Sequence, residues 1–181
     1  MSMLHSVRGK LTVLFMSVSM AATLIVGGYF IYATIEDNDE AERDYRQNIA
    51  EQYDREIRLQ TEGLVSSLDG IYAAQQSGAL TEDVAKAMAI DVIKATRYDE
   101  GKGYFFADEK ATGICVAHAT LGGKVEGKMR LDDQDSQGVY YMREIFKAAA
   151  QEGGGYSNFS FPKPGETQDL PKRGYSMEFK P

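Results

Sequence analysis

The chain of 181 residues has few of the side chains on which most enzymes depend. It contains one cysteine, two histidines and no tryptophan. A single cysteine cannot form an internal disulfide, and Cys115 with His5 and His118 cannot supply a cysteine–histidine zinc site. A nucleophilic triad would have to use His118 alone, and the carboxylates do not form an isolated apolar pair suited to acid–base chemistry. We therefore expect neither an enzyme nor a bound cofactor or metal.

Acidic residues are absent from the first 35 positions, and all 27 Asp and Glu residues follow them. Because Arg8 and Lys10 lie before that point, only 18 basic residues accompany these 27 acids, which gives this region a net charge of −9. Such an acidic region repels phosphate backbones, so nucleic acid is excluded as an expected partner. Cys115 lies in an apolar run and is expected to be a small core residue rather than a reactive thiol.

Charged residues are missing from Leu11 to Ile35, a run of 25 residues. At about 1.5 Å per residue, a helix of this length crosses a hydrocarbon core roughly 30 Å thick. Basic residues precede the run and acids follow it, which places residues 1–10 in the cytoplasm and residues 36–181 outside. A cleaved signal peptide is the alternative, but its apolar core is shorter and ends at small residues, whereas this run ends with aromatic and β-branched side chains. We expect residues 11–35 to form a retained transmembrane helix.

Residues 36–76 predict a long helix that continues from the anchor. No proline interrupts them, and apolar residues recur at spacings typical of one helical stripe. These residues are Tyr45, Ile49, Tyr53, Ile57, Leu64, Leu68 and Ile71. Such a stripe needs a partner, which is either a second subunit or the domain that follows.

The remaining part, residues 80–181, has the pattern of an α+β ligand-binding domain. Thr81 is expected to cap a second helix, with acidic residues in its first turn. The expected elements are a helix over 82–96, a hairpin of strands 104–107 and 114–118, a helix over 136–151, and strands around 159–161 and 175–179. In the helix over 136–151, one face is expected to carry Val139, Met142, Phe146 and Ala149. The order predicts a long helix followed by an antiparallel sheet that a helix interrupts.

Six short motifs occur in a familiar order: Arg97-Tyr98, Gly103-Tyr-Phe-Phe-Ala-Asp108, His118, Glu126-Gly-Lys128, Asp135-Ser-Gln-Gly138 and Lys172-Arg-Gly-Tyr-Ser-Met-Glu-Phe179. With the anchor before them, residues 37–181 resemble the single Cache sensor domain (type 2) of bacterial methyl-accepting chemotaxis proteins. The resemblance implies a PAS-like antiparallel sheet in the periplasm, anchored in the bacterial inner membrane. It also implies a homodimer through the long helix, and a small ligand, often a short organic acid, bound over the sheet.

In that family a further strand, a second membrane helix and a cytoplasmic signalling region come next. The sequence stops before them, so we expect the final strand of the sheet to be missing. We also expect the chain to be the N-terminal portion of a receptor, which signals by a small displacement of its membrane helices.

A small anion needs a fixed cation and several directed donors, because these replace the water that it loses on binding. The predicted ligand-binding residues are Arg97, Tyr104, Phe106, His118, Lys172 and Tyr175. Each also has a structural alternative. Arg97 can stabilise a helix C-terminus, Lys172 can be solvated, and His118 can be a core histidine bonded to the backbone. The aromatic residues can simply pack in the core.

A calcium loop is a weaker alternative for one segment. Positions 1, 3, 5, 6 and 12 of an EF-hand-like loop are occupied by Asp133, Asp135, Gln137, Gly138 and Glu144. Position 5 is a glutamine, position 8 is a bulky tyrosine, and the preceding segment does not have the pattern of a helix. We interpret these residues as the start of the third helix instead.

The first functional hypothesis is the sensing part of a membrane chemoreceptor that binds a small organic anion without converting it. The second is the Cache sensor part of a histidine kinase or a diguanylate cyclase, since the same domain serves such receptors. A third is a non-signalling membrane fragment that dimerises, for which the long helix suffices.

Overall fold

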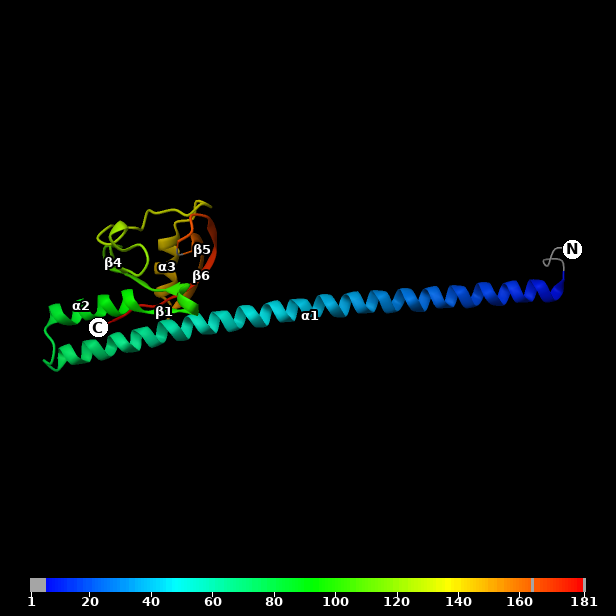
Figure 1. Cartoon of the computed structure of the whole chain (residues 1–181), viewed down its shortest axis with the longest axis horizontal. Helices are drawn as coiled ribbons and strands as arrows, with labels where there is room; N and C mark the ends of the chain where they lie inside the picture. The colour runs from blue at the N-terminus through cyan, green and yellow to red at the C-terminus, as the bar shows by residue number, and fades with distance from the viewer. Residues whose placement is uncertain (1–5, 164, 181) are drawn as a thin grey trace. The chain divides into compact units, whose positions relative to one another are not determined.

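The computed structural model describes residues 6–163 and 165–180 (Figure 1). The chain divides into two compact units, residues 1–52 and 53–181. Among its described residues, the first unit consists of Ser6 and the beginning of helix α1. The second unit holds the end of α1 and all the other helices and strands that the structure describes.

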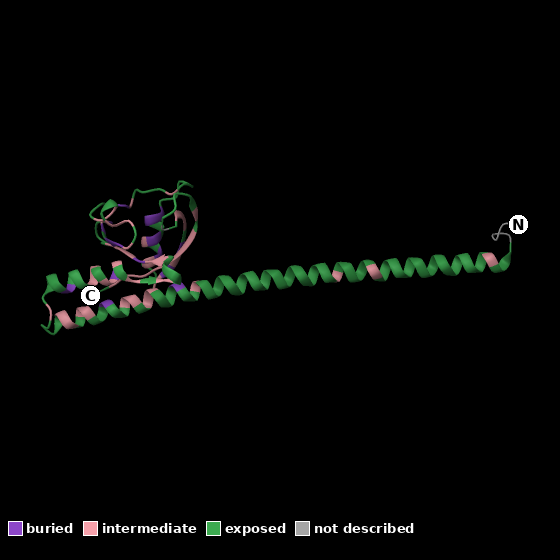
Figure 2. Ribbon diagram, in the orientation of Figure 1, coloured by how far each residue is buried: buried purple, intermediate pink, exposed green. Residues whose placement is uncertain are grey.

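Helix α1 (Val7–Gln76) is a single helix of 70 residues. It confirms the predicted long helix and ends where the sequence predicted, because Gly78 adopts a left-handed φ of 77°. The N-terminal stretch is long and apolar enough to cross a membrane, and nearly all of its residues are exposed (Figure 2). Within the second unit the helix buries Ile57 and Leu68.

Helix α2 (Glu82–Ala95) confirms the second predicted helix and its cap. The Thr81 hydroxyl accepts a hydrogen bond from the backbone N–H of Val84 at 3.4 Å. The inner face of α2 contributes Ile93 to a core cluster with Leu68 of α1. Phe105 and Ala117, from the strand region, complete that buried cluster.

The strands in the described part of the chain form three antiparallel ladders of two strands each. The ladders are β1 (Arg97–Tyr98) with β2 (Gly103–Tyr104), β3 (Phe106–Asp108) with β4 (Cys115–His118), and β5 (Gly155–Pro162) with β6 (Asp169–Ser176). The β3–β4 pair is the predicted hairpin, and the α+β class is confirmed. Cys115 is buried in β4, as expected, and burial raises the pKa of its thiol to about 11.

The first ladder begins directly after the second helix, whose predicted end at residue 96 agrees with the C-cap Thr96. Arg97 follows this cap and begins β1. The connection between β1 and β2 is a turn of 3-10 helix (Asp99–Gly101) in which Asp99 and Glu100 have left-handed φ values of 48° and 53°. Residues with side chains adopt this region at a cost, so the turn is strained.

Helix α3 (Tyr141–Ala149) starts five residues later than the predicted helix over 136–151. The Asp135 carboxylate accepts hydrogen bonds from the backbone N–H groups of Gln137 and Val139, and Gly138 between them has a left-handed φ of 79°. This local turn competes with helix formation, so the segment before Tyr141 is a loop.

The face of α3 that packs in the core also differs from the expected one. Val139 precedes the helix and is exposed, and the buried residues are Tyr141, Met142, Ile145 and Ala148. Three of these, Tyr141, Met142 and Ile145, form a second core cluster, against which phenylalanines 106, 146, 159 and 161 pack. Phe146, which was expected on the same face as Met142, is only partly buried and packs against this cluster. Met142 is fully buried, as that expected face implies.

Strand β6 also lies earlier than predicted. It ends at Ser176, so Met177 and Phe179 lie beyond it, and Lys172 sits within the strand opposite Phe159. Pro171 and Gly174 made this segment a poor candidate for a strand, because proline removes a ladder donor and glycine lacks a side chain to pack. The hairpin still pairs all eight residues of each strand.

Candidate functional site

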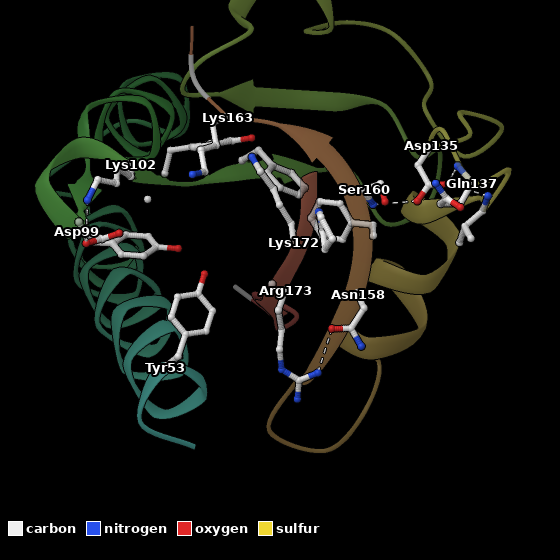
Figure 3. A pocket seen from close by; sticks show the side chains of 18 residues that line it. Tyr53, Asp99, Lys102, Asp135, Gln137, Asn158, Ser160, Lys163, Lys172 and Arg173 are labelled. Atoms are coloured by element: carbon white, nitrogen blue, oxygen red, sulfur yellow. Dashed lines mark hydrogen bonds and ion pairs between the residues drawn. The ribbon is translucent and has the colours of Figure 1, made fainter. Parts of the chain in front are cut away.

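A cavity of about 760 Å³ opens in the second unit (Figure 3). Its walls come from α1, from the β1–β2 segment, from the start of β3, from the loop before α3, and from the β5–β6 hairpin. The aromatic lining residues are Tyr53, Tyr98, Tyr104, Phe106 and Phe159. The charged lining residues are Asp99, Lys102, Asp135, Lys163, Lys172 and Arg173.

The two acids of the lining already have partners. The Asp135 carboxylate accepts backbone N–H groups from Gln137, Val139 and Ser160, each at 2.9 Å, and these bonds lower its pKa. Asp99 lies 3.9 Å from the ammonium of Lys102. The carboxylates therefore leave an excess of basic groups on the cavity wall.

Lys172 is the half-buried cation of this wall. Its ammonium donates a hydrogen bond of 2.8 Å to the carbonyl of Pro162 and lies 5.2 Å from the ring centre of Tyr104 and 5.5 Å from that of Phe161. Among the described residues, no carboxylate lies within 4.0 Å of it. Burial lowers the pKa of Lys172, and the nearby charge of Lys163 lowers it further. An ammonium has three donors, so Lys172 retains the capacity to bind an anion.

Arg173, the next residue of β6, has a partner from α1. Its Nε and one terminal nitrogen donate to the two carboxylate oxygens of Asp54 at 2.5 and 2.6 Å. The other terminal nitrogen donates to the side-chain oxygen of Asn158 at 3.1 Å, and the guanidinium lies 4.7 Å from the ring centre of Tyr156. The Asp54 pair raises the pKa of Arg173.

His118 lies behind the aromatic part of the wall. The residue is 2% exposed, and its ring stacks on Phe106 at 5.4 Å between ring centres and lies 5.4 Å from the ring centre of Tyr104. Its Nδ1 accepts backbone N–H groups from Thr120 at 3.3 Å and Leu121 at 3.1 Å. A nitrogen that accepts two such bonds carries no proton, so the neutral ring holds its proton on Nε2. Burial lowers the pKa of His118 to about 4, and the neighbouring positive charges add to this effect.

A buried ion pair lies beside the same wall. Arg130 donates to both oxygens of Asp108, at 2.9 and 2.5 Å, and the two side chains are only 3% and 4% exposed. The guanidinium lies 5.0 Å from the ring centre of Phe106. The pair lies outside the cavity lining and contacts the aromatic wall through Phe106.

Three of the six predicted ligand-binding residues line the cavity, namely Tyr104, Phe106 and Lys172. His118 contacts two of them from behind. The other two lie outside the lining. Tyr175 donates its phenolic O–H to the carbonyl of Gly153 at 2.5 Å.

Arg97 is engaged with the backbone. Its guanidinium donates to the carbonyls of Lys94 and Thr96 at the end of α2, and to that of Ala119 at 2.6 Å. This arrangement matches the structural alternative considered for Arg97, in which it stabilises a helix C-terminus. The contacts of these six residues with a ligand stay predictions.

Tyr53, Lys102 and Arg173 line the cavity but were not among the predicted site residues. Tyr53 belonged to the predicted helical stripe, which gave no reason to connect it with a site. Arg173 adjoins Lys172, and this double basic sequence was the one available signal. Asp108 belonged to one of the six motifs, but nothing in the sequence indicated its pairing with Arg130, which lies 22 positions away.

Comparisons with known proteins place this geometry among sensor domains. The family model described as Cache domain matches residues 31–181. The chain is 29% identical over 125 residues to the methyl-accepting chemotaxis protein McpP of Pseudomonas putida, an alignment that covers 66% of this chain and 21% of that protein. The chain thus spans about a fifth of the length of this curated relative.

Solved structures show the same similarity. A methyl-accepting chemotaxis protein from Vibrio parahaemolyticus has a TM-score of 0.62 and 27% identity, with 73% of this chain and 83% of that chain covered. A Cache chemosensory domain described for its recognition of carboxylic acids has a TM-score of 0.57 and 26% identity, with 69% and 86% covered. A periplasmic sensor domain of a chemotaxis protein, 22% identical with 70% and 85% covered, shares the fold at a TM-score of 0.64.

Proposed function

This chain belongs to the Cache domain family, and we propose that its cavity binds a small organic anion as the sensing part of a membrane chemoreceptor. The observation that carries the proposal is Lys172, a half-buried cation on the cavity wall with no carboxylate partner within 4.0 Å among the described residues. A short carboxylate is the ligand class that fits it best. The solved Cache domain described as recognising carboxylic acids supports this choice.

The wall around Lys172 suits a carboxylate with a short carbon chain. A hydrogen bond between an ammonium and a carboxylate is stronger than a neutral one, and partial burial reduces the competition from water. Tyr104 brings a phenolic group to the same wall, and the rings of Phe106 and Phe159 offer apolar surface to the carbon chain. The proposed role is binding and release, without conversion of the ligand.

The proposal also includes the setting of the domain. Residues 1–10 would lie in the cytoplasm, residues 11–35 would cross the bacterial inner membrane, and residues 36–181 would form the periplasmic sensor. The apolar stretch of α1 supports the anchor. A homodimer through the long helix would cover Tyr45 and Ile49, which are 66% and 47% exposed. The ligand would signal across the membrane by favouring the arrangement to which it binds more tightly.

Calorimetric titration of the full chain in lipid nanodiscs tests the binding site. Acetate, propionate, lactate and succinate are the anionic probes, and methylammonium is the cationic control. We expect saturable binding of at least one carboxylate and none of the cation. Lys172→Met keeps the apolar stem and removes the charge, so it should weaken binding about 10- to 150-fold, as loss of a charged hydrogen bond worth about 1.5–3 kcal/mol implies.

Lys147→Met is the matched control, because Lys147 is an exposed lysine of α3 that does not line the cavity. It should change the affinity less than about twofold. A folded chain that binds none of the four carboxylates would contradict the proposal. Equal affinities of the Lys172→Met and wild-type chains would remove Lys172 from the site.

A further inference from the structure

We propose that Arg173 is a second anion-binding residue of the cavity and that Asp54 competes with the ligand for it. The proposal rests on the proposed function, because it concerns the same cavity and the same class of ligand. In the structure Asp54 occupies the guanidinium with its own carboxylate. A ligand carboxylate would take its place.

The position of Arg173 makes this exchange possible. Its side chain lines the cavity directly after Lys172 in β6, and Figure 3 shows it beside Asn158 on the wall. It is the cavity cation with the geometry for two parallel hydrogen bonds, which is the geometry in which a carboxylate is best recognised. The group that now satisfies this geometry, Asp54, is chemically a short carboxylate.

The energetics of the exchange are balanced. The Arg173 and Asp54 side chains are 37% and 24% exposed, so this pair is only partly withdrawn from water. If a ligand displaces Asp54, Arg173 keeps a carboxylate partner, and the released Asp54 is hydrated. Neither charge is left buried and unpaired, which is the condition that makes the loss of a buried ion pair costly.

The exchange also connects the cavity with α1. Asp54 belongs to α1, and its backbone carbonyl accepts a second link, the hydrogen bond of 3.0 Å from the Tyr156 hydroxyl. By thermodynamic reciprocity, if Asp54 weakens the binding of an anion, the anion weakens the contact of Asp54 with β6 by the same factor. Occupancy of the cavity would thereby loosen one of the polar contacts between α1 and the β5–β6 hairpin.

The first test is Asp54→Asn in the full chain in nanodiscs, titrated with acetate. Asparagine preserves the shape and one acceptor oxygen but not the charge, so it competes less well for Arg173. We expect acetate to bind this variant about 2- to 5-fold more tightly than it binds the wild type, the range that an ion pair worth up to about 1 kcal/mol implies. The gain should vanish in Asp54→Asn/Arg173→Gln. Glu62→Gln, which removes the carboxylate of an exposed ion pair with Arg58 on the same helix, is the control and should leave the affinity unchanged.

The second variant, Asn158→Asp, keeps the original pair and adds a carboxylate 3.1 Å from the remaining guanidinium nitrogen. It should weaken acetate binding about 2- to 5-fold. If the Arg173–Asp54 pair had only a structural role, its loss in Asp54→Asn would weaken acetate binding or leave it unchanged. An unchanged or weakened affinity in folded Asp54→Asn would overturn the proposal. If that variant does not fold, an unchanged or increased affinity in Asn158→Asp would do so.

The two proposals fail in different ways. Absence of acetate binding to the wild type, together with no binding of the other carboxylates, would contradict the proposed function and this inference with it. Normal binding to the wild type with no increase in Asp54→Asn would leave the proposed function intact and overturn the role of Asp54.

Discussion

Lowering the pH from 7 to 4 should destabilise the fold through His118, and the structure gives the size of the effect. The unfolded chain takes up a proton on this ring near pH 6.5, whereas burial lowers the pKa in the folded chain to about 4. Between these values the unfolded state binds more protons, so stability rises with pH and is lost as the pH falls. The difference of about 2.5 pKa units, at about 1.36 kcal/mol each, corresponds to about 3 kcal/mol.

The structural cause of this effect is the set of contacts around the ring. Protonation of Nδ1 would place an N–H against the backbone N–H groups of Thr120 and Leu121, which now donate to that nitrogen. It would also create a charge that is 2% exposed, near the cations Arg130 and Lys172. These costs are absent at pH 7, where the ring is neutral in both states.

The assay is urea unfolding of the full chain, followed by near-UV circular dichroism of the tyrosines at pH 7.5 and pH 4. The comparison variant is His118→Asn, which retains an acceptor for the two backbone donors and does not titrate. Carboxylates that titrate in this range contribute equally to both proteins. We expect the wild type to lose about 3 kcal/mol more than the variant between the two pH values. Parallel losses in the two proteins would refute the reasoning.

Two further predictions concern the walls of the site. Asp108→Asn should destabilise the fold by about 3–5 kcal/mol, because it leaves Arg130 buried without its counter-charge. Asp132→Asn, which breaks an exposed pair with Arg143, should cost less than about 1 kcal/mol. Equal losses of unfolding free energy in the two variants, measured by urea unfolding, would contradict this account. Glu100→Gly should stabilise the fold by about 0.5–1 kcal/mol, because glycine adopts the left-handed φ of 53° without strain. The same replacement at Lys102, whose φ is −75°, should be destabilising, and a lower melting temperature for Glu100→Gly would argue against strain in this turn.

Elements governed by local signals could be predicted from the sequence. The end of α1 at Gln76 and the cap at Thr81 depend on residues within a few positions, and both were confirmed. The predicted start of α3 was wrong because Asp135 forms a turn with Gln137 and Val139 that competes with the helix, and the backbone N–H of Ser160, 25 positions away, also donates to this carboxylate. A carboxylate ahead of a helix has the same local pattern whether it caps that helix or anchors a distant strand.

In the candidate site, too, local sequence patterns were informative, whereas contacts between distant residues could not be predicted. Lys172 was selected because an anion needs a cation near the last strand, and it lies on the cavity wall. Arg97 was selected on the same reasoning, but its guanidinium is engaged with three backbone carbonyls. Composition identifies which cations exist, but it does not tell which of them the fold has already neutralised. That depends on pairings such as Arg173 with Asp54, which are 119 positions apart.

The burial of Cys115 has a practical consequence for spectroscopy on this chain. It is the only thiol in the sequence, it is 1% exposed, and its raised pKa keeps it protonated at neutral pH. An accessible thiolate is the nucleophile that reacts with maleimides and with thiol-reactive spin labels. A cysteine introduced on the surface would therefore take up a spin label or fluorophore selectively, in a background that needs no prior removal of the native one.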